Sequence, residues 1–320
     1  MNLNGLNPKI NPFLLNRYNE SYLYGIQEDV LSDFKKGHYL DFMRLHTIRN
    51  DGHYAKALML EEELAKINLS NRNNKFDYIR YYFIALYIHR TSNIFVLNKS
   101  DVKNRNLKDD KQPLQIDRER SWVHSLFNSE ADYQRHVQQA DLTGEEQKYL
   151  KHSGWLSMLN IVSLPMFGKS KFHLNKNNDF TFSLDYLRVP FGQMFGQNIW
   201  VLHKDKQLHG LFLKQYKTYE KTTLGVGYKL YDYKLFRNMY VNTTLDAWSQ
   251  PSELQFRDKS SKPGFHIGQL YEYQFLPDKY KNRNNMSLFV GYDYKTHGYM
   301  PQSYHTSKNF EIKLGFKWHF

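Results

Sequence analysis

The stretch from Asn309 to Phe320 reads NFEIKLGFKWHF and carries an apolar residue at every second position until the sequence ends. The apolar set is Phe310, Ile312, Leu314, Phe316, Trp318 and Phe320. Successive side chains of a β-strand point to opposite faces, so this stretch predicts a strand with one apolar and one charged face. A long apolar face on an edge strand promotes aggregation in water, so the pattern favours apolar surroundings for that face.

Similar alternation recurs upstream and predicts an antiparallel meander. Six further strands are expected near residues 180–186, 211–216, 223–230, 241–247, 265–275 and 287–295. Closure with antiparallel neighbours favours an even number, so we predict about eight strands, with ten as the next choice. The eighth strand is expected at Lys171–Leu174 or at Asn198–His203.

Bacterial outer-membrane β-barrel proteins characteristically end in an alternating strand with a terminal Phe or Trp, and the segment from Phe310 to Phe320 resembles that signature. The resemblance implies a transmembrane β-barrel over residues 154–320, located in the outer membrane of a Gram-negative cell envelope. Its apolar faces would point outward at lipid and its charged faces inward. The alternative is a soluble, lipocalin-like barrel whose apolar faces point inward.

The first half of the chain has helical periodicity instead. Between Leu14 and Leu97 apolar residues recur at intervals of three and four, which predicts a helical bundle over residues 1–97. Residues 98–153 are expected to form a linker with short helices, including one from Ser129 to Ala140. Thr143 and Glu146 have the spacing of a capping box at the start of another. The predicted fold class is therefore α+β by halves.

The net charge of +12 belongs almost entirely to the second half. Residues 1–150 contain 21 Lys and Arg against 20 Asp and Glu, whereas residues 151–320 contain 23 against 12. A basic surface attracts anions, and for a membrane protein the expected partners are the bilayer and anionic lipid or lipopolysaccharide. No Arg-rich helix or zinc-finger spacing is present, so nucleic acid is not an expected partner.

Other sequence features limit the protein class. The longest apolar runs are too short or too interrupted for a transmembrane helix. The chain contains no cysteine, so disulfides and thiolate metal sites play no part. The start at Met1 lacks the features of a secretory signal, so we expect the sequence to be a mature form or a fragment of an exported protein.

Four residues of the predicted inner face are candidates for catalysis: His266, Asp246, Ser287 and Glu272. A histidine can take a serine proton while a carboxylate orients the imidazole, which is hydrolase chemistry. Paired charges inside a barrel need the same residue types, so whether the protein is an enzyme stays open. No cofactor motif and no helical histidine pair for a metal occurs.

Two function hypotheses follow from this pattern. The first is a non-enzymatic outer-membrane protein in binding, assembly or transport. Its helical half, too large for the interior of a narrow barrel, would meet an envelope protein partner from outside. The second is a lipid-modifying hydrolase of the phospholipase or deacylase type.

Overall fold

The second half of the chain folds into one sheet. The computed structural model describes residues 28–47, 54–55, 58, 61–62, 65, 115–134, 137–162, 172–203, 207–275, 285–301, 303 and 305–319. Nine strands pair with their sequence neighbours, all antiparallel, in the order β1 to β9. They are β1 (Phe172–Asn175), β2 (Asn178–Val189), β3 (Gly192–His203), β4 (Leu208–Lys217), β5 (Thr222–Phe236), β6 (Met239–Pro251), β7 (Ser261–Gln274), β8 (Asn285–Lys295) and β9 (Asn309–His319).

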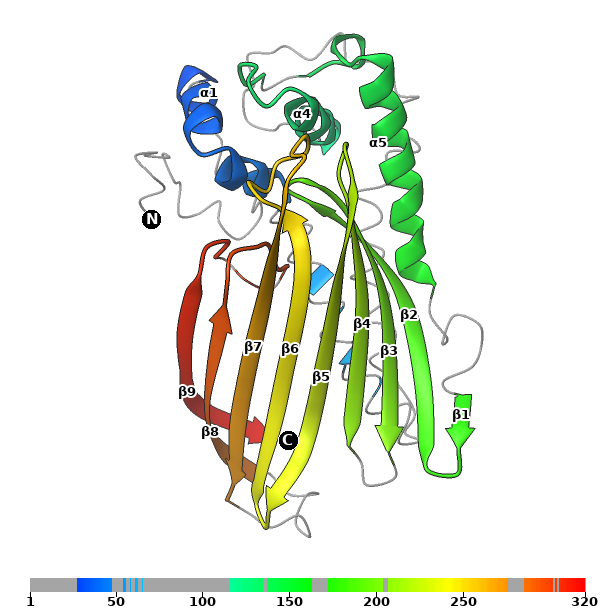
Figure 1. Cartoon of the computed structure of the whole chain (residues 1–320), viewed down its shortest axis with the longest axis vertical. Coiled ribbons are helices and arrows are strands. Elements are labelled where there is room, and N and C mark those ends of the chain that lie inside the picture. Colours follow the sequence, from blue (N-terminus) through cyan, green and yellow to red (C-terminus); the bar gives the residue numbers. More distant parts are fainter. Residues whose placement is uncertain are drawn as a thin grey trace.

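The meander is confirmed, while the strand count and closure differ from the prediction. Both candidates for the eighth strand are present, because β1 contains residues 172–175 and β3 contains residues 192–203. The described sheet is open: β1 and β9 are its two edges, and no pairing joins them. Figure 1 shows that the sheet curls, with β8 and β9 turned around relative to β2, β3 and β4.

The two faces of the sheet differ in exposure with a period of two. On β4, Leu211 and Leu213 are 46% and 50% exposed, whereas Phe212 and Tyr216 between and beyond them are 4% and 1% exposed. The same alternation holds on β5, where Leu224 is exposed and Thr223 is buried. We call the face that carries Phe212 the inner face and the face that carries Leu211 the outer face.

Helices cover the end of the sheet at which the β2–β3, β4–β5, β6–β7 and β8–β9 connections lie (Figure 1). These helices are α1 (Glu28–Gly37), a further helical stretch over residues 39–47, α4 (Gln115–Phe127) and α5 (Gly144–Leu156). Short 3₁₀ turns η2 (Gln139–Asp141) and η3 (Ser157–Ile161) flank α5. Among the described residues, no helix is both long and apolar enough to cross a membrane.

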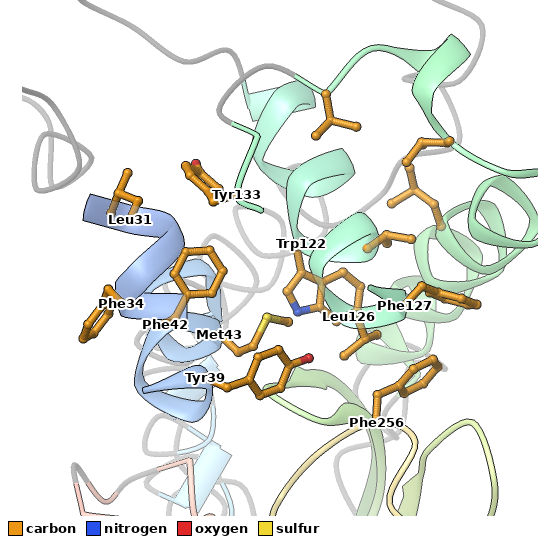
Figure 2. Packing of buried hydrophobic residues seen from close by; sticks show 14 residues of the cluster. Leu31, Phe34, Tyr39, Phe42, Met43, Trp122, Leu126, Phe127, Tyr133 and Phe256 are labelled. Carbon is orange, nitrogen blue, oxygen red and sulfur yellow. The ribbon is translucent and has the colours of Figure 1, made fainter. Parts of the chain in front are cut away.

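An apolar core joins the helices to each other and to the sheet. Figure 2 shows Phe42 and Met43 facing Trp122 and Leu126 of α4, with Phe256 from the β6–β7 connection closing the cluster below. The Phe127 and Phe256 rings lie 5.0 Å apart. Burying an aromatic ring of this size contributes roughly 2–3 kcal/mol. Through Phe256, the β6–β7 connection is therefore part of the core formed by the helices.

Polar contacts reinforce this junction at three places. Lys35 of α1 donates from Nζ to the carbonyls of Asn128 and Ala131, at 2.6 and 2.7 Å. Arg188 of β2 forms an ion pair with Glu119 of α4 and donates from Nε to Ser153 of α5 at 2.7 Å. The helical end and the sheet are therefore fastened by buried hydrogen bonds as well as by apolar packing.

The helix predictions for the first half are only partly right. The predicted helix over residues 129–140 is wrong, because its described part is irregular and contains only the start of η2. α4 precedes it instead and buries Trp122, Val123 and Leu126. The capping box is confirmed: Thr143 accepts from the Glu146 amide at 3.2 Å, and Glu146 accepts from the Thr143 amide at 2.7 Å. Residues 66–114, which include the last part of the predicted bundle over residues 1–97 and the first part of the predicted linker over residues 98–153, lie outside the described residues.

Candidate functional site

A row of alternating charges crosses the inner face from β4 to β9. Lys214 donates from Nζ to Asp246 Oδ1 at 2.7 Å. The other oxygen of Asp246 lies 3.4 Å from His266 Nδ1, and His266 Nε2 lies 2.9 Å from Asp293 Oδ1. Asp293 also forms an ion pair with Lys313. The five side chains make one connected sequence of base, acid, base, acid and base, which we call the charge row.

Small residues make room for the charge row. A Cβ at Gly227 would overlap the Asp246 carboxylate, and a Cβ at Gly268 would overlap the Asp293 carboxylate. Both glycines face their aspartate across a strand pair, at Gly227–Asp246 and Gly268–Asp293. The carboxylates therefore lie flat against neighbouring backbone, where a larger residue would displace them.

The histidine of the charge row is held from both sides. His266 is a donor at only one nitrogen when neutral and at both when protonated, and each nitrogen faces a carboxylate. An imidazolium between Asp246 and Asp293 would satisfy both acids at once. The geometry suits a buried electrostatic link, because a proton acceptor for general base catalysis needs one nitrogen directed at a substrate.

Residues from the first half reach the inner face as well. Glu61 is 7% exposed and accepts from the hydroxyl of Ser183, from Asn198 at 3.4 Å and from Trp200 Nε1 at 2.9 Å. Glu62 forms an ion pair with Lys229 of β5. The expectation that the helical half stays outside the barrel is therefore wrong for these residues. The interior of a closed narrow barrel is filled by its own side chains, whereas an open sheet leaves room along its inner face.

Two cavities adjoin the charge row on the inner face. One of about 170 Å³ is bounded by Lys214, Asp246 and His266 and, on the side of the first half, by Tyr54. The other, of about 210 Å³, is bounded by His266, Lys313 and Ser303. Pockets for drug-sized ligands usually occupy roughly 300–1,000 Å³, so these spaces suit water or small ions better than a large substrate.

The four candidate catalytic residues fall into two separate groups. Asp246 and His266 meet in the charge row, as described above. Glu272 lies 3.7 Å from Lys317, and Ser287 stands opposite Lys317 in the β8–β9 register. His266 stands opposite Lys295 of β8, and Ser287 lies eight residues away from Lys295 on the same strand. At about 3.3 Å per residue, Ser287 is about 26 Å from the position that faces His266. Ser287 therefore cannot act as a nucleophile activated by His266.

Alternation along the sequence predicts that Lys214, Asp293 and Lys313 lie on the charged, inward face of their strands, but it does not show which of them pair. The register that joins them depends on the lengths of the connections between strands, which alternation does not give. Glu61 was missed because the Glu61-Glu62-Glu63 run suggests a solvated helix face. Glu61 is bound by the neutral side chains of Ser183, Asn198 and Trp200. Neutral residues do not indicate in the sequence that an acidic side chain lies beside them.

Metal binding and similarity to known proteins give no further assignment. No group of three His, Asp or Glu side chains with metal-binding geometry occurs among the residues that the structure describes. The chain matches no family model, no curated protein and no solved structure. Any function must therefore be argued from the chain's own geometry.

Proposed function

We propose that this chain is an integral β-sheet protein of the bacterial outer membrane, with a non-enzymatic role in binding, assembly or transport. The observation that carries the proposal is the apolar band of the outer face. It extends from β3 to β9 and comprises the exposed side chains of Ile199, Leu211, Leu213, Leu224, Val226, Leu245, Phe265, Val290, Phe310, Ile312, Leu314 and Phe316.

Such a band is costly in water. Soluble monomers rarely expose contiguous apolar patches larger than a few hundred Å². Each of these side chains gains about 1 kcal/mol when its exposed half leaves water, so the twelve together favour an apolar environment by on the order of ten kcal/mol. Hydrocarbon around the outer face supplies that environment without any protein partner.

Strand length and the position of the charges agree with this placement. Strands β2 to β9 contain 10 to 15 residues, and a tilted strand needs roughly 9–11 to cross a bilayer. The charge row lies on the opposite face, where its members pair with each other. The helical end would then stand outside the bilayer, on one side of it.

The same placement suggests partners. Five basic side chains lie in or next to the β4–β5 and β6–β7 connections at the helical end, against the three acidic residues Glu220, Glu253 and Asp258: Lys217, Lys221, Arg257, Lys259 and Lys262. Lipid phosphates or lipopolysaccharide would provide the matching negative charge. The helical half would offer its own surface to an envelope protein, with Trp155 of α5 55% exposed.

The proposal is tested by the behaviour of the purified full chain on unheated and heated gels. We expect solubility only with detergent or lipid, and a shift in mobility on heating, because a folded membrane sheet resists denaturation by cold detergent. A chain that stays monomeric and folded in buffer without detergent would overturn the membrane placement.

The hydrolase alternative retains one favourable contact, the pair of His266 with Asp246. It lacks a nucleophile at Ser287, and both nitrogens of His266 face carboxylates. We therefore place it second. Loss of phospholipid or lipopolysaccharide deacylation in His266→Ala, with folding intact by heat-modified mobility, would reverse this order.

A further inference from the structure

The apolar band of the outer face contains a groove over the middle of strands β4 to β7. The groove has a volume of about 460 Å³, and most of the side chains that line it are apolar, among them Leu211, Val226, Leu245, Ala247, Phe265 and Ile267. Ala247 stands between Val226 and Phe265 in the strand register, so a single methyl group separates two longer side chains. Pockets for small ligands usually occupy roughly 300–1,000 Å³, so this groove has room for part of an acyl chain.

The outer face becomes polar at one level on these strands, between the groove and the helical end. Thr222 lies four residues before Val226 on β5, and Ser261 lies four residues before Phe265 on β7. Lys217 faces Thr222 from β4. At about 3.3 Å per residue, this polar border is about 13 Å from the groove. The hydrocarbon core of a bilayer is roughly 30 Å thick, so a border at its surface would place the groove near its middle.

Two ammonium groups stand at the polar border. Lys217 is exposed on the outer face at the end of β4. Lys221 of the β4–β5 connection donates from Nζ to the Ser261 hydroxyl at 3.0 Å and to the Lys259 carbonyl. Lys221 therefore reaches across to the start of β7, above the groove. Within the part of the chain that the structure describes, neither ammonium group forms an ion pair with a carboxylate.

The acids of the same connections leave this border positive. Glu220, Glu253 and Asp258 stand against five basic residues in or next to the two connections, so five minus three gives a net charge of +2. Asp258 accepts hydrogen bonds from the Glu253 amide at 2.7 Å and from the Ser260 amide and hydroxyl at 2.9 and 2.7 Å. Both of its oxygens are thus bound within its own connection, and the two lysines remain available to an external anion.

We propose that this region binds one anionic phospholipid, with an acyl chain in the groove at Ala247 and the phosphate between Lys217 and Lys221. The inference rests on the proposed function, because the groove takes an acyl chain only where the outer face meets lipid. The Ser261 hydroxyl accepts from Lys221 and keeps its own proton to donate to a phosphate oxygen, as does the exposed Thr222 hydroxyl. Lipopolysaccharide carries more acyl chains than a phospholipid, so a single groove favours the phospholipid.

Lipid retention by the full chain tests the acyl-chain part of the site. The chain is transferred from vesicles of equal phosphatidylglycerol and phosphatidylcholine into mild detergent, and bound lipid is counted by native mass spectrometry. We expect one phosphatidylglycerol per chain, since only this headgroup brings a net negative charge. Ala247→Phe fills the groove and should reduce that retention roughly tenfold. Thr243→Phe is the matched control on the same face of β6, and it should retain lipid as the native chain does.

Neutral substitutions test the headgroup part of the site. Lys217→Gln and Lys221→Gln should each reduce the preference for phosphatidylglycerol over phosphatidylcholine about fivefold, because each removes one cation beside the phosphate. The total amount of bound lipid should fall less, since the groove is intact. Arg237→Gln removes a basic side chain from the β5–β6 connection, at the opposite end of the sheet, and should leave the preference unchanged.

Three results would overturn the phospholipid site. The first is equal retention of phosphatidylglycerol and phosphatidylcholine by the native chain. The second is unchanged retention in Ala247→Phe. The third is preferential retention of lipopolysaccharide when it is added to the vesicles. Carbonate extraction of the same membranes reports separately on insertion: an embedded chain without lipid preference refutes the site alone, whereas a chain released by carbonate refutes the membrane placement.

Discussion

The outer and inner faces of the same strands differ in the kind of side chain that each exposes or buries. On the outer face, Leu224 of β5 is 66% exposed. On the inner face of the neighbouring strand, Asp246 is 8% exposed and is bound by Lys214 and His266. A single exposed leucine is ordinary in a water-soluble protein, but a large exposed apolar patch beside a face of buried charges is not. The comparison shows that this sheet exposes apolar side chains on one face and buries paired charges on the other, and this difference is what supports the proposed placement in a bilayer.

The charge row gives the largest expected effect. Asp246→Ala leaves Lys214 and His266 buried without their shared acid, and breaking a buried pair in this way costs about 3–5 kcal/mol. The free energy of unfolding by urea in detergent micelles measures the loss. Asp132→Ala is the control, because its ion pair with Lys36 is exposed and its removal should change stability far less. Equal effects would mean that the inner face is as wet as the surface.

The outer face is tested by Leu245→Lys, at the middle of β6. A lysine facing the middle of a bilayer costs roughly 2–4 kcal/mol, whereas at an exposed position in water it costs almost nothing. Unfolding measured in lipid vesicles should show the larger penalty. Thr244→Lys, on the inner face, provides a comparison in the same part of the sheet. Full stability of Leu245→Lys in vesicles would speak against lipid contact at β6.

A smaller effect is expected where the first half meets the inner face. Glu61→Ala removes the acceptor shared by Ser183, Asn198 and Trp200 and should cost about 2–3 kcal/mol. Glu61→Gln keeps an acceptor oxygen and should cost less. Limited proteolysis near residue 61 reports on the same contact, with faster cleavage expected in Glu61→Ala than in Glu61→Gln. Identical cleavage in both variants and the native chain would deny the contact a stabilising role.

The smallest effect concerns the helical end and depends on pH. Burial lowers the pKa of Lys35 to about 8 against an ordinary value of 10.5. The unfolded chain therefore binds more protons between these two values, so folding stability should rise with pH from about 8 to 10.5, by about 1–2 kcal/mol. Lys35→Met should reduce that rise, measured as the unfolding midpoint of the helical region. An undiminished rise in Lys35→Met would assign it to other groups.

Alternation made most of the sheet predictable, because period two assigns both a strand and its faces. β4 to β9 lie where Leu211, Leu224, Leu245 and the terminal stretch place them. β3 was only an alternative, since Gly196 and polar residues interrupt its pattern. The local capping box at Thr143 was also readable, because its two hydrogen bonds depend on residues three apart.

Features that depend on distant residues were not predictable. α4 is held by contacts of Trp122 and Leu126 with residues 31–43, which no local pattern reveals. The contacts of Glu61 with the inner face lie in a sheet that is open, and alternation does not predict whether a sheet closes. The contacts within the charge row depend on the register between strands, which the sequence does not give. The sequence therefore indicates only that Asp246 and His266 are of residue types that can pair.

Direct contact of the outer face with hydrocarbon is measured most simply by fluorescence quenching. Val226→Cys on the outer face and Thr244→Cys on the inner face each add the single thiol of the chain, which takes one environment-sensitive probe. In vesicles, a nitroxide on the lipid chains should quench the probe at 226 strongly and the probe at 244 weakly. Stronger lipid quenching at 244, or quenching of 226 only by a water-soluble reagent, would contradict the account.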